Sequence, residues 1–153
     1  MSAAAPLPRA EWLQVVRSAP LVSIDLILLD PQDRVLLGLR ENEPARGCWF
    51  VPGGVVRKGE SLDAAFSRIA ESELGRPLQR KDAALLGVYE HFYDQNFAGA
   101  AGFGTHYVVL AHRLALAGEQ RPADAQHSAL RWFGVAELLA EPSVHANVKA
   151  YFR

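Results

Sequence analysis

Cysteine, clusters of one charge and long apolar runs are scarce or absent in this sequence. Cys48 is the single cysteine, so no internal disulfide can form and a reducing compartment is expected. The formal net charge is −1 without a basic cluster, which argues against a surface for nucleic acid or anionic membranes. No apolar segment is long enough to span a bilayer, and the N-terminus does not resemble a signal peptide. We therefore expect a cytoplasmic protein with no nucleic-acid or membrane partner.

The composition is that of a globular protein, with half of the residues hydrophobic and 22% charged. At this length, residues 1–153 are expected to form a single domain. The hydrophobic periodicity predicts a mixed sheet with helices on both faces, an α/β (α+β) fold. We expect helices over 9–18, 62–74, 135–140 and 143–152, and strands over 21–30, 34–40, 48–51, 84–93, 105–116 and 130–134.

The predicted helix over 62–74 has an acidic residue in its apolar stripe. With Leu62 at zero and about 100° per residue, Glu73 falls near 20° and Glu71 near 180°. A carboxylate on the buried face, in the last helical turn, is disfavoured both by burial and by the helix dipole. Two interpretations stay open at this point. Either a metal or fixed cation lies beside Glu73, or Arg68 forms a buried ion pair with it.

The spacing of five residues along this segment resembles the Nudix box, a family signature. They are Gly54, Glu60, Arg68, Glu73 and Gly75, with Ser61 as the expected helix N-cap and Gly75 just past the helix end. The box is incomplete, because Ile69 and Ser72 stand where the family usually carries glutamates. One carboxylate can hold Mg²⁺ if other oxygen donors complete its coordination, but it is a poor basis for a site with several metals.

This depleted box resembles the GDP-mannose mannosyl hydrolase branch of the Nudix superfamily. The similarity extends beyond the box, into segments such as GCWFVPGG (47–54), GVYEHFYDQNF (87–97), DAQHSALRW (124–132) and VHANVKAYF (144–152). It implies a Nudix-like α/β/α sandwich and a homodimer. It also implies Mg²⁺-dependent hydrolysis of a GDP-hexose, GDP-mannose or GDP-glucose, with Mn²⁺ as an alternative ion. Water would attack the sugar C1 with inversion, releasing GDP and the free hexose.

The resemblance also implies a metal site and a general base. The ion would be held by the carbonyl of Gly53, the carboxylate of Glu73 and the side-chain amide of Gln126, all oxygen donors that suit Mg²⁺. A glycine at 53 leaves the carbonyl accessible, although a plain tight turn at Gly53 and Gly54 is the simpler interpretation without the motif. His127, in a polar loop before strand 130–134, would be the general base, because histidine titrates near neutral pH.

Further residues are predicted to bind the substrate or support the site. Asp25 interrupts an apolar strand and must meet a partner, either the sugar, as the resemblance implies, or an internal ion pair. Glu60 and Arg68 are expected to hold the motif loop and orient Glu73. By resemblance, His91 would contact the sugar and diphosphate, Tyr107 the leaving group and Arg40 a phosphate.

One position departs from the branch pattern. Val55 stands where the branch usually carries an arginine that neutralises the leaving phosphate. Arg57 lies two residues on, on the same strand face, and we expect it to replace that charge in part. Two other functions stay open: an ordinary Nudix pyrophosphohydrolase that attacks phosphorus, and a Nudix-fold binding module without catalysis.

Overall fold

A seven-stranded mixed sheet forms the centre of the protein in the computed structural model, which describes residues 5–116 and 127–153, the side chains of 127 and 128 excepted. The strands pair in the order β3-β2-β1-β6-β5, with β4 beside β1 and β7 beside β2. β1 and β6 are parallel and the other pairs are antiparallel. The strands are β1 (Leu21–Leu29), β2 (Val35–Arg40), β3 (Trp49–Phe50), β4 (Gly53–Val55), β5 (Ala84–Tyr93), β6 (Thr105–Ala115) and β7 (His127–Phe133).

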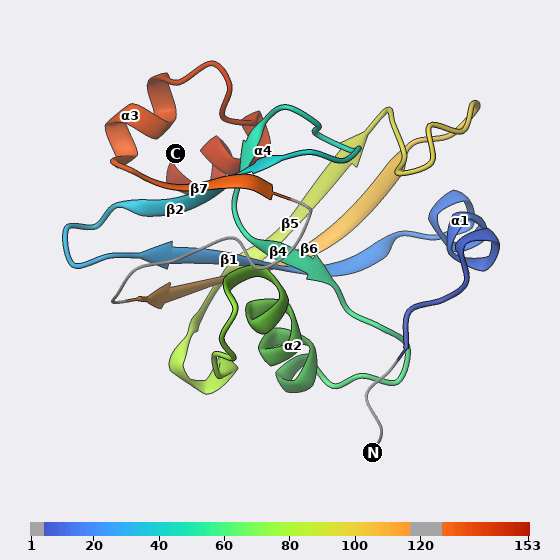
Figure 1. Cartoon of the computed structure of the whole chain (residues 1–153), viewed down its shortest axis with the longest axis horizontal. Helices are drawn as coiled ribbons and strands as arrows, with labels where there is room; N and C mark the ends of the chain where they lie inside the picture. Colours follow the sequence, from blue (N-terminus) through green and yellow to red (C-terminus); the bar gives the residue numbers. More distant parts are fainter. Residues whose placement is uncertain (1–4, 117–126) are drawn as a thin grey trace.

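Helices cover both faces of this sheet (Figure 1). α2 lies on one face, and α3 and α4 lie on the other near the C-terminus. The helices are α1 (Arg9–Ser18), α2 (Leu62–Leu74), α3 (Val135–Ala140) and α4 (Ala146–Lys149), with 3₁₀ turns η1 (Arg80–Asp82) and η2 (Ala150–Phe152). This confirms the predicted α/β/α sandwich with a mixed sheet.

The alternation of side chains along β1 divides the core in two. Ile24 and Leu26 pack with Phe66 of α2 in one cluster of buried residues. Ile27 points to the other face and packs with Leu138 and Tyr151 in a second cluster. Since successive strand residues face opposite sides, Asp25 shares the face of Ile27 and looks away from α2.

The ends of α2 follow the sequence prediction. The hydroxyl of Ser61 accepts a hydrogen bond from the amide of Ala64 at 3.1 Å, which caps the N-terminus. Gly75 has a φ of 76°, the left-handed conformation that ends helices and that glycine adopts without a steric penalty. Glu73 is 3% exposed and Glu71 is exposed, as the helical periodicity predicts.

Three local predictions were wrong. The terminal helix expected over 143–152 is a short α-helix, α4, followed by the 3₁₀ turn η2. Gly53 and Gly54 do not form a turn, because β4 begins at Gly53 and pairs antiparallel with β1. His127 does not lie in a loop, because β7 begins there, three residues before its predicted start. The long pairing of β7 with β2 explains the position of His127, since a register shift between Gly38 and Arg40 carries the ladder on to His127.

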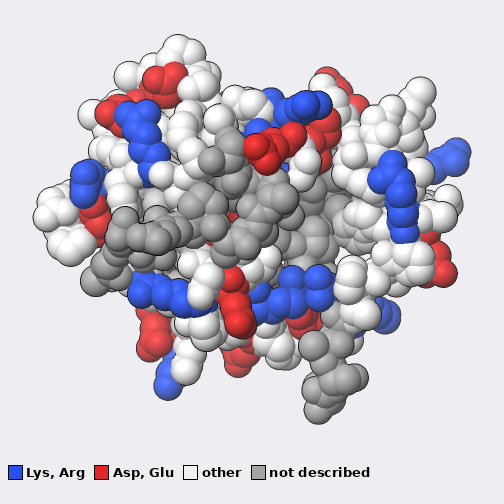
Figure 2. Space-filling model, viewed as in Figure 1, with Lys and Arg blue, Asp and Glu red and all other residues white. Residues whose placement is uncertain are grey.

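The described surface mixes charges of both signs. On the face in Figure 2, Lys and Arg side chains alternate with Asp and Glu over the described residues, without a large patch of one sign. Within residues 5–116 and 127–153, every helix is too short or too polar to cross a bilayer.

Candidate active site

A cavity of about 530 Å³ brings together residues that the sequence places far apart. Strands β1, β2, β4, β5 and β6, the loop after β2, and α1 all contribute to its wall. Five predicted site residues line it: Asp25, Arg40, Gly53, His91 and Tyr107. The fold therefore collects around one cavity most of the predicted substrate-binding groups that the structure describes.

Asp25 is the buried acid of this cavity, with 6% of its surface exposed. Its Oδ2 accepts a hydrogen bond of 2.5 Å from the hydroxyl of Tyr151, so its partner is a phenol. Burial raises the pKa of Asp25 to about 7, against the lowering effects of the Tyr151 hydrogen bond and the Arg40 charge. The negative charge of Glu73 adds a smaller increase to the same pKa.

Because the pKa of Asp25 is raised in the folded protein, its ionisation lowers the free energy of unfolding at alkaline pH. Below about pH 4 both folded and unfolded states hold the proton, whereas between about pH 4 and 7 the unfolded state ionises first. Stability therefore falls as pH rises to about 7, by up to roughly 4 kcal/mol. In EDTA, we expect Asp25→Asn to raise the free energy of unfolding at pH 8 but not at pH 4.

Chemical denaturation at both pH values would check this expectation. Asp94→Asn, at an exposed aspartate, is the matched control and should change stability little at either pH. If Asp25→Asn destabilised the protein equally at pH 4 and pH 8, the burial penalty at Asp25 would be refuted.

Two aromatic side chains of the cavity keep their neutral forms at physiological pH. His91 is 4% exposed, and burial together with the nearby His145 lowers its pKa to about 4. Burial also raises the pKa of Tyr107, so its hydroxyl stays protonated. His91 can therefore exchange neutral hydrogen bonds, and Tyr107 can donate one to a ligand oxygen.

Arg40 supplies a fixed positive charge at the end of β2. Its Nε donates a hydrogen bond of 2.8 Å to the carbonyl of Pro44, which anchors the side chain to the following loop. The backbone of Arg40 is also in register with that of His127 on β7. The sheet thus places the backbone of the predicted base directly across from a cavity arginine.

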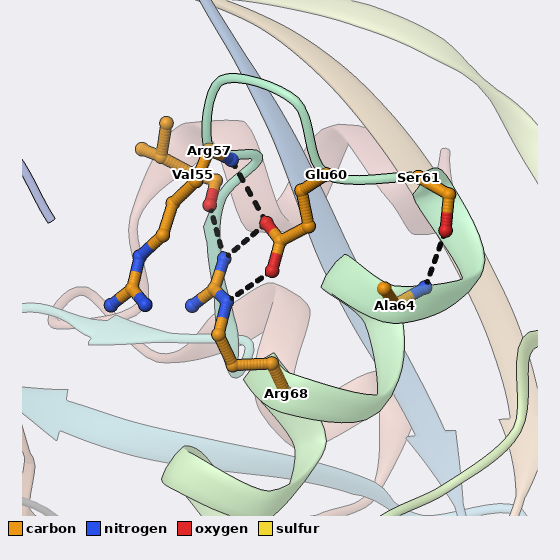
Figure 3. Close-up of polar contacts among 6 residues, drawn as sticks. All are labelled: Val55, Arg57, Glu60, Ser61, Ala64 and Arg68. Atoms are coloured by element: carbon orange, nitrogen blue, oxygen red, sulfur yellow. Dashed lines mark hydrogen bonds and ion pairs between the residues drawn. The ribbon is translucent and has the colours of Figure 1, made fainter. Parts of the chain in front are cut away.

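Glu60 and Arg68 form the bridge that holds the motif loop against α2 (Figure 3). Arg68 Nε lies 2.7 Å from Glu60 Oε2, and Arg68 Nη2 donates to Glu60 Oε1 at 2.9 Å and to the carbonyl of Val55 at 2.8 Å. Glu60 Oε1 also accepts from the amide of Arg57. The hydrogen bond from Arg68 is the main reason why the pKa of Glu60 is lowered. The sequence left open an ion pair between Arg68 and Glu73. In the structure, the ion pair of Arg68 is formed with Glu60.

Two arginines follow β2 and β4, and only one of them lines the cavity. Arg46, in the loop after β2, lines the cavity, whereas Arg57 does not. Figure 3 shows the guanidinium of Arg57 directed away from the Glu60 carboxylate that binds its backbone amide. The sequence pattern gave no reason to choose Arg46, because it lies in a polar loop without periodicity.

Of the three predicted metal ligands, the structure describes Gly53 and Glu73. Glu73 is buried in the last turn of α2, and its charge acts unfavourably on buried Asp25, a repulsion that a cation would relieve. Glu73 itself does not line the cavity, and Gln126, the third predicted ligand, lies outside the described residues. Over the part of the chain that the structure describes, no three His, Cys, Asp or Glu side chains gather to hold a metal.

Ile69 occupies a position where a second carboxylate would otherwise face β4. It is 2% exposed, and a Cβ added to Gly54 would lie 3.0 Å from its Cγ1. Ser72, the other substituted position, is exposed. The helix face that carries Glu73 is thus packed as hydrophobic core, which limits the acidic groups there.

Sequence reasoning also missed Tyr151, which contacts Asp25 although it does not line the cavity. Its contact with Asp25 joins residues 126 positions apart, so no local pattern could reveal it. The only sequence signal is that it lies within the segment VHANVKAYF, which shares the family resemblance. An aromatic wall was also missed: Trp12 and Phe97 line the cavity, and the guanidinium of Arg9 lies 5.2 Å from the Phe97 ring centre.

Comparisons with known proteins agree with this architecture. The sequence model of a family described as NUDIX domain matches residues 19–153. The chain is 43% identical over 127 residues to the low-salt glycan biosynthesis protein Agl8 of Haloferax volcanii, covering 83% of this chain and 79% of that protein. It is 40% identical over 70 residues to an ADP-ribose pyrophosphatase of Methanocaldococcus jannaschii, covering 46% and 40%. The crystal structure of a MutT NUDIX hydrolase from Burkholderia pseudomallei superposes with a TM-score of 0.69 at 30% identity, covering 88% of this chain and 96% of that chain.

Proposed function

This chain belongs to the NUDIX domain family and is a Nudix hydrolase of a nucleotide derivative, and on that premise we propose that its substrate is a GDP-hexose. In this proposal water attacks C1 of GDP-mannose or GDP-glucose with inversion, and the products are GDP and the free sugar. The observation that carries the proposal is the motif helix, where Glu73 is buried beside the apolar Ile69. A single carboxylate there favours one metal ion and a reaction that does not depend on a cluster of ions.

The cavity residues have distinct tasks in this reaction. The guanidinium of Arg40 binds the diphosphate, and planar guanidinium groups suit phosphate oxygens. The protonated hydroxyl of Tyr107 donates a hydrogen bond to the leaving oxygen, while Asp25 and neutral His91 bind the sugar. His127 accepts a proton from the attacking water as general base. These groups orient the sugar carbon between a base and a neutralised leaving group.

Magnesium would be held by the Gly53 carbonyl, the Glu73 carboxylate and the Gln126 amide, and its charge would neutralise the departing GDP. The position of Gly53 supports its share of this task, because a Cβ there would collide with Asp25 Oδ1 and the Ile24 carbonyl. A larger residue at 53 would therefore displace both the predicted ligand and the buried acid.

The ordinary pyrophosphohydrolase is the second candidate function. The similarity to an ADP-ribose pyrophosphatase over part of the chain supports it, and the replacement of two motif glutamates by Ile69 and Ser72 speaks against it. A binding module without catalysis is the third. The joint presence of Glu73, Gln126 and His127 speaks against that function.

Product analysis separates the three functions. The protein is incubated with GDP-mannose and Mg²⁺, the nucleotides are separated by anion-exchange chromatography, and the nascent sugar is followed by NMR. We expect GDP together with free hexose whose first anomer is inverted from that of the substrate. GMP with sugar phosphate would support the pyrophosphohydrolase, and unchanged substrate would support the binding module.

The positions of Arg46 and Arg57 give a second expected result. Since Arg46 lines the cavity, we expect Arg46→Ala to lower kcat/KM by roughly 10-fold or more, the usual cost of one hydrogen bond to a charged group. Arg57→Ala should have a smaller effect, because Arg57 does not line the cavity, and unchanged turnover would exclude the idea that Arg57 compensates for Val55. Steady-state kinetics of both variants in parallel measures the comparison, and a larger loss for Arg57→Ala would assign the compensating charge to Arg57.

The homodimer is proposed from the family resemblance. Sedimentation equilibrium would give about twice the chain mass of 16.8 kDa for a dimer, and the chain mass itself would refute it.

A further inference from the structure

The C-terminal segment forms the support behind the polar wall of the cavity. Tyr151, in η2, is 7% exposed and does not line the cavity, whereas Asp25 and His91 both do. Its hydroxyl donates to Asp25 Oδ2 at 2.5 Å and lies 3.4 Å from His91 Nε2. One phenol thus contacts, from behind, two side chains that we assign to the sugar.

Packing fixes the position of this hydroxyl. The ring of Tyr89 meets the ring of Tyr151 edge-on, with centres 4.7 Å apart and planes at 88°. Tyr151 also belongs to the second core cluster, with Ile27 and Val148. Because the ring of Tyr151 is buried among these side chains, its rotation would cost core contacts. The hydroxyl is therefore held where it meets Asp25.

The hydrogen bond from Tyr151 uses Oδ2 of Asp25, so Oδ1 can bind a ligand. Oδ2 is occupied by Tyr151, while Oδ1 lies on the side of Gly53, where a Cβ would be 2.5 Å away. Gly53 is itself part of the cavity wall. Burial raises the pKa of Tyr151, so that the phenol remains a donor at neutral pH.

We propose that Tyr151 is a positioning residue, whose hydroxyl holds the Asp25 carboxylate in one orientation so that Oδ1 binds a hydroxyl of the sugar. The inference rests on the proposed function, since it assigns Asp25 to the hexose part of the substrate. Loss of the Tyr151 hydroxyl leaves a rotating carboxylate, which binds the sugar more weakly. The diphosphate is assigned chiefly to Arg40, which Tyr151 does not contact, so the affinity for GDP alone should depend little on Tyr151.

The test compares two ligands. Tyr151→Phe removes the hydroxyl and keeps the packed ring, and Tyr89→Phe is the matched control, because Tyr89 packs against the same ring outside the cavity. Calorimetry in Mg²⁺ gives the dissociation constants of GDP-mannose, under conditions where turnover is slow, and of GDP. We expect Tyr151→Phe to weaken GDP-mannose by roughly 10- to 100-fold and GDP by less than about 2-fold, with Tyr89→Phe changing neither.

A double-mutant cycle tests the route through Asp25. In an Asp25→Ala background, Tyr151→Phe should not weaken GDP-mannose further. Equal weakening of GDP and GDP-mannose by Tyr151→Phe would overturn the proposal, because it would indicate general damage to the cavity. An unchanged affinity for both ligands would overturn it as well.

A spectroscopic measurement covers the case in which Tyr151→Phe does not fold. A hydroxyl proton held by a buried carboxylate gives a downfield ¹H signal in the otherwise unaltered protein. We expect such a signal from Tyr151, and we expect Asp25→Asn to shift or remove it. Its absence would overturn the contact. All these readouts measure binding or structure, so GMP and sugar phosphate as products would refute the proposed function without deciding the role of Tyr151.

Discussion

Glu73→Gln should lower kcat/KM by about 100-fold or more, because it removes the carboxylate that we assign to Mg²⁺. The substitution keeps the size of the side chain and its place on the buried face of α2, where Glu73 is 3% exposed. It also removes a negative charge that raises the pKa of Asp25. Chemical denaturation of the variant in EDTA would separate loss of a ligand from loss of the fold.

Glu71→Gln is the matched control, since Glu71 lies on the same helix and is exposed. Titration with Mn²⁺, followed by electron paramagnetic resonance, would measure ion binding independently of activity. We expect weakened binding for Glu73→Gln and unchanged binding for Glu71→Gln. A Glu73→Gln variant with undiminished Mn²⁺ affinity and turnover would remove the metal assignment.

His127→Ala should lower kcat by roughly 10²- to 10⁴-fold at neutral pH and change KM little, as expected for loss of a general base. The backbone of His127 is in register with that of Arg40, whose side chain lines the cavity. The base is thus predicted to act beside the arginine that we propose for the diphosphate. His91 is a poor alternative base near neutral pH, because it is buried in a site that lowers its pKa to about 4 and therefore binds protons weakly.

The dependence of kcat on pH is a second measurement that tests His127→Ala. The acid limb of log kcat against pH should report protonation of the general base, and this limb should disappear in His127→Ala. His106→Ala is the control, because His106 is partly exposed and stacks on Phe92. Loss of the acid limb in His106→Ala instead would transfer the role of base to that residue.

The helix and strand order was readable from the sequence because local patterns determine it. The apolar stripe of α2, its Ser61 cap and its Gly75 terminus are all encoded within a short segment, and the structure begins and ends the helix at the predicted residues. β1 and β6 were likewise predicted from apolar runs, but no pattern within either strand predicted that they pair in parallel.

The predictions differ from the structure where contacts between segments distant in sequence determine the local structure. The β7 strand extends to His127 because β2 offers a pairing partner, although the residues around His127 have a polar, loop-like sequence. Arg68 lies nearer in sequence to Glu73 than to Glu60, yet the returning motif loop brings Glu60 within 2.7 Å of it. Tyr151 reaches Asp25 only after the C-terminal segment has packed on the sheet. Such tertiary contacts leave no periodic trace in the sequence.

The bond that breaks is tested most directly by hydrolysis of GDP-mannose with Mg²⁺ in ¹⁸O-labelled water, followed by mass spectrometry of both products. We propose that water attacks the sugar carbon with the help of Asp25, Arg40 and His127. The heavy oxygen should then appear in mannose, and GDP should stay unlabelled. Heavy oxygen in a phosphate, whether of GMP or of mannose phosphate, would contradict cleavage at carbon.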